Sequence, residues 1–178
     1  LLERFRIRTV PLTIQSGERV FPDDGGYTSA DLYADYRSRG TLPKTAAVPP
    51  GVYYDKFKQW TDAGCSVVHI GLSSAISSSY QNACTAAAEF ENVYVVDSRN
   101  LSTGIALLVL DAAERAEKGE DPKEIAALMR ETAKKVEASF VIDTLFYLQK
   151  GGRCSTLAAL GANLLKLKPC IEVKDGKM

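Results

Sequence analysis

The sequence has no apolar run of the roughly 18 residues that a membrane-spanning helix requires, and it does not begin with the basic and then apolar pattern of a signal peptide. It also has no excess of either charge, because 22 basic residues are matched by 22 acidic ones. A basic surface of the kind that binds nucleic acids is therefore not expected. We expect a cytoplasmic protein with no membrane span and no nucleic-acid partner.

Sequence signals for metal, disulfide and nucleotide sites are also absent. The four cysteines are spaced singly, without a Cys-x-x-Cys pair, and His69 is the only histidine. Buried thiols explain such cysteines best. Neither a GxGxxG nor a GxxxxGK[ST] motif occurs, so a nucleotide site is poorly supported. We expect no metal and no cofactor. What remains is a chain of 178 residues, 46% hydrophobic and 25% charged, which is ordinary for a globular protein.

Two short and continuously apolar runs, residues 65–72 and 92–98, predict buried strands. The segments around them have the period and the end signals of helices. Four helices are expected: one from Val-Pro-Pro-Gly to a stop at Gly64, then residues 78–90, residues 102–118, and one that follows Asp121 as N-cap. This alternation predicts an α/β fold with a parallel sheet and crossover helices.

The pattern changes after residue 139, and we place a domain boundary near residues 138–145. Residues 1–140 are then a first, small parallel-sheet α/β domain, and residues 141–178 are the start of a second α/β domain. Both ends of the chain have the character of interrupted elements. The first residues are typical of the end of a helix followed by a strand, and the last predicted strand runs into an Asp-Gly turn with no returning strand.

The most informative segment joins the first apolar run to the next helix and contains five serines: Ser73, Ser74, Ser77, Ser78 and Ser79. In open parallel sheets, ligands bind at the carboxyl edge of the strands, and a helix N-terminus there favours an anion. Helix capping explains one or two of these serines without any ligand. A Ser–His hydrolase is unsupported because His69 lies inside the apolar run, as an interior residue whose hydrogen bonds we expect to be satisfied.

Three other polar positions deserve notice. Thr45 lies among prolines in the segment 42–50, which taken alone is typical of a linker. Arg153 follows two glycines and could bind a carboxylate or a phosphate, although a solvated arginine after a helix C-cap explains it equally well. Asp97 ends the second apolar run.

Several blocks of the sequence together resemble the DegV family of bacterial fatty-acid-binding proteins over nearly the whole chain. The blocks are VPLTI, the Thr45 segment, the serine segment, VVDS, FVIDTLFYLQKGGR, and LKP close to a DGK turn. The resemblance implies two α/β domains that clasp a long-chain fatty acid, with the tail buried and the carboxylate held by hydroxyls. It also implies a non-enzymatic lipid carrier, for which one branch of the family has a separate fatty acid kinase subunit as partner.

By position, the resemblance assigns carboxylate binding to Thr45, Ser77 and Arg153, with Ser73, Ser74, Ser78 and Ser79 as less specific candidates. The chain departs from the family pattern where Ala46-Ala47-Val48 replaces Ser-Gln-Pro and where Ser78 replaces a glycine. Two alternatives stay open. One is a standalone α/β phosphotransferase or phosphate-binding enzyme that uses the serine segment as an anion cradle and Asp97 as its carboxylate. The other is a structural or regulatory domain whose serines only cap helices.

Overall fold

The computed structural model describes residues 1–152 and 168–178. By packing, the described chain forms two compact units. The first contains Leu1–Val10, Ala47–Ala138 and Val173–Lys177, and the second contains Pro11–Ala46, the described part of Ser139–Glu172, and Met178. These units interleave along the chain, so the division into consecutive domains near residues 138–145 stays a prediction.

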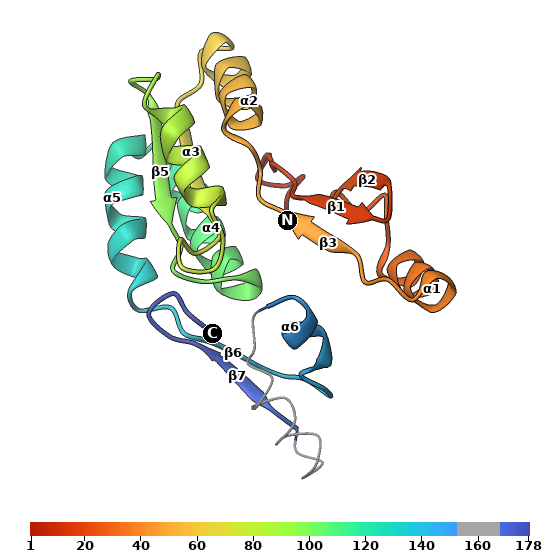
Figure 1. Ribbon diagram of the computed structural model, residues 1–178. Helices are drawn as coiled ribbons and strands as arrows, with labels where there is room; N and C mark the ends of the chain where they lie inside the picture. The colour runs from red at the N-terminus through yellow and green to blue at the C-terminus, as the bar shows by residue number, and fades with distance from the viewer. Residues whose placement is uncertain (153–167) are drawn as a thin grey trace. The chain divides into compact units, whose positions relative to one another are not determined.

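The first unit is built on two parallel strands, β4 (Val67–Gly71) and β5 (Val93–Asp97). The predicted α/β fold is thereby confirmed. Four helices accompany the strands, and Figure 1 shows their order: α2 (Pro50–Asp62), α3 (Ser79–Ala87), α4 (Ser102–Glu117) and α5 (Pro122–Ala133). Because the register pairs Gly71 with Asp97, both strands end at the same edge of the sheet.

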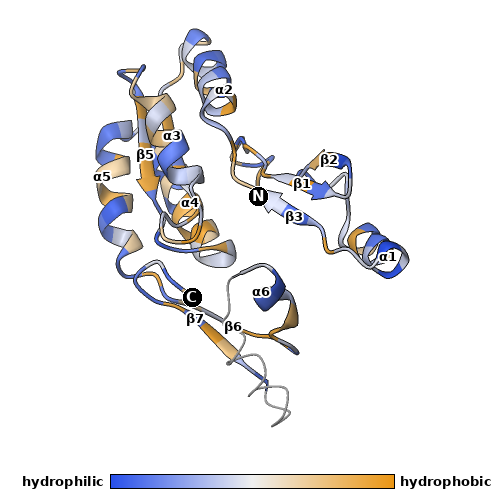
Figure 2. Ribbon diagram, in the orientation of Figure 1, coloured by the Kyte–Doolittle hydropathy of each residue, from blue (hydrophilic) through white to orange (hydrophobic). Residues whose placement is uncertain are grey.

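The two faces of this sheet carry different helices because successive residues of a strand point to opposite faces. Val68 and Ile70 of β4 pack against the core that Val96 forms with α4 and α5. The alternate residue His69 instead contacts the rings of α2. In Figure 2, most of β5 has the colour of apolar residues, as expected for a strand covered on both faces.

The core of the first unit lies between β5 and the helices α4 and α5. Leu108 of α4 and Ile125, Ala126 and Met129 of α5 are at most 2% exposed. Full burial of a leucine, isoleucine or methionine side chain contributes about 1.5–3 kcal/mol, so this face supplies much of the unit's stability. It holds β5, and with it the strand edge that carries Asp97, in a fixed position.

The helix signals in the sequence are confirmed where they were strongest. Asp121 caps α5 by accepting hydrogen bonds from the backbone amides of Lys123 and Glu124, at 2.9 and 3.1 Å. Gly64 follows α2 with a positive φ of 81°, a conformation that glycine adopts at little cost. The Asp-Gly turn is also present, because Asp175 and Gly176 both have positive φ between the bridged residues Lys174 and Lys177.

The second unit contains the antiparallel sheet β2-β1-β3 and the helix α1 (Ser29–Arg39). Its strands are β1 (Thr13–Ser16), β2 (Arg19–Pro22) and β3 (Lys44–Ala46). The interpretation of residues 42–50 as a linker is therefore wrong, since Thr45 lies in β3 and pairs with Ile14 of β1. A three-residue edge strand flanked by prolines is too short to give an alternating pattern in the sequence.

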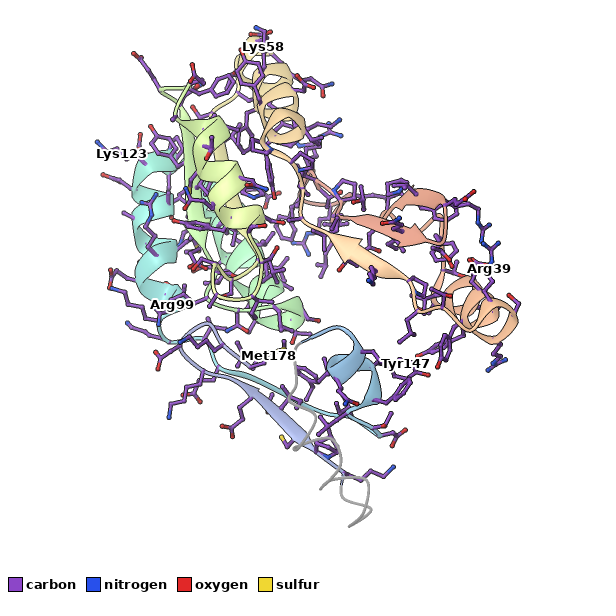
Figure 3. All side chains as sticks on the ribbon, in the orientation of Figure 1. Arg39, Lys58, Arg99, Lys123, Tyr147 and Met178 are labelled. Atoms are coloured by element: carbon purple, nitrogen blue, oxygen red, sulfur yellow. The ribbon has the colours of Figure 1, made fainter. Side chains whose placement is uncertain are left out.

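The same unit contains the short helix α6 (Phe146–Lys150), while β6 (Ala138–Val141) pairs with β7 (Cys170–Val173). Tyr147 of α6, labelled in Figure 3, packs edge to face against Tyr33 and Tyr36 of α1. Helix α6 ends directly before the two glycines at positions 151 and 152. At the start of the chain, residues 2–6 form a hydrogen-bonded turn in place of the expected end of a helix.

Candidate ligand-binding site at the serine loop

Residues 73–79, here called the serine loop, follow the last residues of β4 and lead into α3. The loop therefore lies at the carboxyl edge of the parallel sheet, which is where the sequence placed it and where open α/β sheets bind ligands. It starts with a turn in which the carbonyl of Ser73 accepts hydrogen bonds from the amides of Ile76 and Ser77, both at 3.0 Å.

The first two serines hold the loop to neighbouring segments. Ser73 is fully buried, and its hydroxyl donates to the carbonyl of Gly176 at 2.6 Å. Ser74 donates from its hydroxyl and from its amide to the two carboxylate oxygens of Asp97, at 2.5 and 3.2 Å. These contacts give both serines a structural role. The Asp97 carboxylate, on which the enzyme alternative relied, also accepts the amide of Arg99 at 2.8 Å.

The later serines form the N-terminal end of α3. The Oγ of Ser77 accepts the amide of Ser79 at 3.2 Å and donates to the Oγ of Ser79 at 3.1 Å. The expected capping bond from the N-cap serine is not formed, since the N-cap is Ser78, and the amide of Ser79 is instead accepted by Ser77, the residue before the N-cap. Ser79 is 3% exposed, Ser77 is half-buried, and Ser78 is exposed without a capping hydrogen bond from its side chain. Ser74 is also exposed but already donates its hydroxyl to Asp97, so the hydroxyls left for a ligand are those of Ser77 and Ser78.

The end of the serine loop is fastened to the segment that precedes α2. The amide of Val48 donates to the Oγ of Ser79 at 3.3 Å, and the side chain of Asn82 donates to the carbonyl of Val48 at 2.8 Å. Val48 itself is 2% exposed. Neither Val48 nor Asn82 was a candidate from the sequence, because Val48 acts through its backbone and the two contacts join residues 31 and 34 positions apart.

The remaining predicted residues lie elsewhere in the chain. Thr45 is exposed on β3 in the second unit, and within the described residues its hydroxyl has no hydrogen-bond partner. Arg153 lies outside the described residues. The two glycines before it are described, and Gly152 has the positive φ of 76° that is typical of the residue after a helix end.

His69 is an interior residue, as the sequence indicated, but its hydrogen bonds are not satisfied. Within the described part of the chain, its Nε2 is buried without a partner. The imidazole packs edgewise against Tyr53 and Phe57 of α2, with ring centroids 5.1 and 5.7 Å away. Burial lowers the pKa of His69 from 6.5 to about 4, so the ring is neutral at pH 7. The apolar pattern around His69 could not reveal a missing partner.

Residues 1–152 and 168–178 contain neither a candidate metal cluster nor a helix that could cross a membrane. No three side chains among their histidines, cysteines, aspartates and glutamates are arranged to hold a metal ion. None of their helices combines the length and the apolar character needed to span a membrane.

The fold and the loop define an α/β protein with a hydroxyl-rich loop and a helix N-terminus at the carboxyl edge of a parallel sheet. The family model described as "Uncharacterised protein, DegV family" matches residues 1–178. The chain therefore belongs to the DegV family, as the sequence blocks indicated.

Curated relatives agree with this assignment. A DegV domain-containing protein of Clostridium acetobutylicum is 33% identical over 180 residues, and one of Clostridium perfringens is 31% identical over the same length. Each comparison covers 100% of this chain and 64% of the relative. The chain thus spans less than two thirds of the length of the relatives that it matches.

Solved structures with the same fold include proteins described as binding fatty acids. A fatty-acid-binding DegV family protein from Thermus thermophilus superposes with a TM-score of 0.88 at 28% identity, over 99% of this chain and 64% of that one. The fatty acid binding protein DegV from Bacillus subtilis superposes with a TM-score of 0.83 at 27% identity, with the same coverage. A stearic-acid-binding protein from Eubacterium ventriosum gives 0.85 at 27% identity, over 99% and 63%.

Proposed function

We propose that this chain binds a long-chain fatty acid as a lipid-binding protein and not as an enzyme. The carboxylate is held by the hydroxyls of Thr45 and Ser77, with the guanidinium of Arg153 as a third donor. The observation that carries the proposal is the half-buried Ser77 hydroxyl at the N-terminus of α3, in a chain whose structural relatives are described as binding fatty acids.

The chemistry of the proposed donors suits a carboxylate. A buried carboxylate is costly unless several donors meet it, and a helix N-terminus offers free amides together with the positive end of its dipole. Ser78 is exposed at this end of α3, and the Thr45 hydroxyl has no competing partner among the described residues. The Ser77 hydroxyl donates to Ser79 and can rotate to donate to a ligand.

The chain connection between Thr45 and the serine loop supports their joint use. Val48 follows Thr45 by three residues and is bonded to Ser79. Three trans peptide units span at most about 11 Å between α-carbons. The α-carbon of residue 45 is therefore at most about 11 Å from that of Val48, the residue bonded to the serine loop.

The remaining parts of the proposal concern the tail and the partner. We propose that the acyl tail is buried between two domains, where each methylene contributes about 0.8 kcal/mol to binding. We also propose that the protein is cytoplasmic and presents its ligand to a separate fatty acid kinase subunit. This chain has no phosphate-binding sequence motif, which supports the proposal that the partner subunit binds ATP.

Native mass spectrometry of the purified protein, followed by lipid extraction, tests the proposal. We expect a long-chain fatty acid to co-purify and to return when the stripped protein is incubated with palmitate or oleate. Retained nucleotide or Mg²⁺ would support the enzyme alternative instead. A protein that stays empty after incubation with either fatty acid would leave only the structural or regulatory alternative.

A further inference from the structure

Asp97, the last residue of β5, is bonded to the start of the serine loop through both of its carboxylate oxygens. Oδ2 accepts the hydroxyl of Ser74 at 2.5 Å, and Oδ1 accepts the amides of Ser74 and Arg99 at 3.2 and 2.8 Å. Hydrogen bonds to an ionised acceptor are stronger than those between neutral groups. Asp97 therefore fixes where the serine loop leaves the sheet.

The Asp-Gly turn packs behind the same part of the loop. Ser73 donates to the carbonyl of Gly176, and Arg99, labelled in Figure 3, forms an ion pair with Asp175 at 3.0 Å. Added bulk has no room at this contact, since a Cβ on Gly176 would lie 2.7 Å from the Oγ of Ser73. The turn thus contacts both Ser73 in the serine loop and Arg99, two residues after Asp97.

The anchored start of the loop is connected to Ser77 by one turn. The carbonyl of Ser73 accepts the amide of Ser77 at 3.0 Å, so a shift of Ser73 and Ser74 moves the backbone of Ser77. At the other end, Ser79 is held by Val48. Ser77 and Ser78 lie between these two anchors. Their side chains are held less tightly to the rest of the first unit than those of the other serines.

We propose that Asp97 is a positioning residue of the head-group site, which holds the serine loop in the conformation that presents the Ser77 hydroxyl to the ligand. This inference rests on the proposed function but assigns Asp97 no contact with the fatty acid. Its two carboxylate oxygens accept three hydrogen bonds within the protein, and all three donors are backbone or side-chain groups of Ser74 and Arg99.

The expected effect follows from the population of the loop conformation. A site that is competent in only a fraction of the molecules binds with an affinity reduced by that fraction. If D97A leaves the loop correctly placed in about one molecule in ten, the affinity for palmitate falls about tenfold. D97N keeps an acceptor for the two amides, and we expect it to restore most of the affinity.

The test is a double-mutant cycle with Ser77, measured as palmitate affinity. D97A should weaken binding in the wild-type background and should have no further effect in the S77A background. D121A is the matched control, because Asp121 also accepts two backbone amides but caps α5 away from the loop. It should lower stability while leaving the affinity unchanged. Equal losses from D97A in both backgrounds, or a loss from D121A of the same size, would overturn the inference.

A readout that needs no ligand separates this inference from the proposed function. In ¹H–¹⁵N spectra, the amides of Ser77 and Ser79 should shift in D97A, shift less in D97N, and stay in place in D121A. Unmoved amides in both Asp97 variants would overturn the positioning role even if palmitate binds. A wild-type protein that binds no fatty acid, with the loop amides shifted in D97A, would instead refute the proposed function and retain Asp97 as the anchor of the loop.

Discussion

The backbone amide of Val48 donates a hydrogen bond to the Oγ of Ser79 at 3.3 Å. This contact joins the segment that follows β3 to the first residue of α3, across 31 positions of the chain. Because both residues are buried, neither group can exchange its partner for water. The bond therefore sets where the chain that carries Thr45 enters the first unit.

Replacing Ser79 by alanine should destabilise the fold by about 1–3 kcal/mol, because the Val48 amide is then buried without an acceptor. Urea denaturation followed by circular dichroism measures the change. S78A is the matched control, since Ser78 is the exposed neighbour with no capping hydrogen bond from its side chain. It should stay within about 0.5 kcal/mol of the wild type. Equal stability of the two variants would contradict the role given to Ser79.

Replacing Gly176 by alanine should lower the stability of the protein more than replacing Gly119, although the two glycines have similar backbone conformations. The φ angles are 78° and 79°, so the left-handed conformation costs alanine about 1–2 kcal/mol of folding free energy at either position. Only at Gly176 does the new Cβ meet the Ser73 hydroxyl, while at Gly119 it meets no atom within 4 Å. Thermal unfolding of G176A and G119A compares the two, and a smaller loss for G176A would refute the packing of the Asp-Gly turn on the serine loop.

His69 should make the fold sensitive to mild acid. Burial lowers its pKa in the folded protein to about 4, whereas in the unfolded chain it keeps the ordinary value of 6.5. As the pH falls from 6.5 towards 4, the unfolded chain binds the proton and the folded chain does not. The free energy of unfolding should then fall by about 1.4 kcal/mol per pH unit relative to H69L, and level off below pH 4. Parallel pH profiles of the two proteins would contradict the burial of this ring.

Asp35 should stabilise the second unit through its charge. Its pKa is lowered by the hydroxyls of Tyr27 and Ser16 and by the nearby arginines Arg19 and Arg39. The stabilisation is therefore present above the ordinary value of 3.8 and is lost as the pH falls through the lower folded value.

The variant D35N should accordingly unfold at a lower temperature than the wild type at pH 7, with the difference shrinking in strong acid. D62N is the control, because Asp62 pairs with Lys58 in an exposed contact of helix α2 and such pairs contribute little. If D35N and D62N changed the unfolding temperature equally at pH 7, the Asp35 cluster would have no special role.

The sequence predicted the first unit well because its signals are local. Asp121 followed by proline predicts a helix start, and the β-branched run before Asp97 predicts a buried strand; both are in the structure. The helix α1 was missed although its signal was present, since Thr28 and Asp31 form a reciprocal capping box. No residue of α1 is buried, so the segment has no hydrophobic period that would predict a helix.

The candidate site was less predictable because it depends on long-range contacts. The serine cluster could be found from the sequence, but the different roles of its individual serines could not. The bond of Ser73 joins residues 103 positions apart, and that of Ser74 joins residues 23 positions apart. Only the fold brings Gly176 and Asp97 to these serines, and it leaves the side chains of Ser77 and Ser78 without a hydrogen bond to a distant segment among the described residues.

The most direct test of the account is the palmitate affinity of the double variant T45V/S77A, measured by isothermal titration calorimetry beside the wild type and S78A. Each lost hydrogen bond to the charged carboxylate should cost about 1.5–3 kcal/mol, so the double variant should bind at least a hundredfold more weakly while unfolding at a temperature near that of the wild type. An unchanged affinity in the double variant would contradict the claim that these two hydroxyls hold the head group.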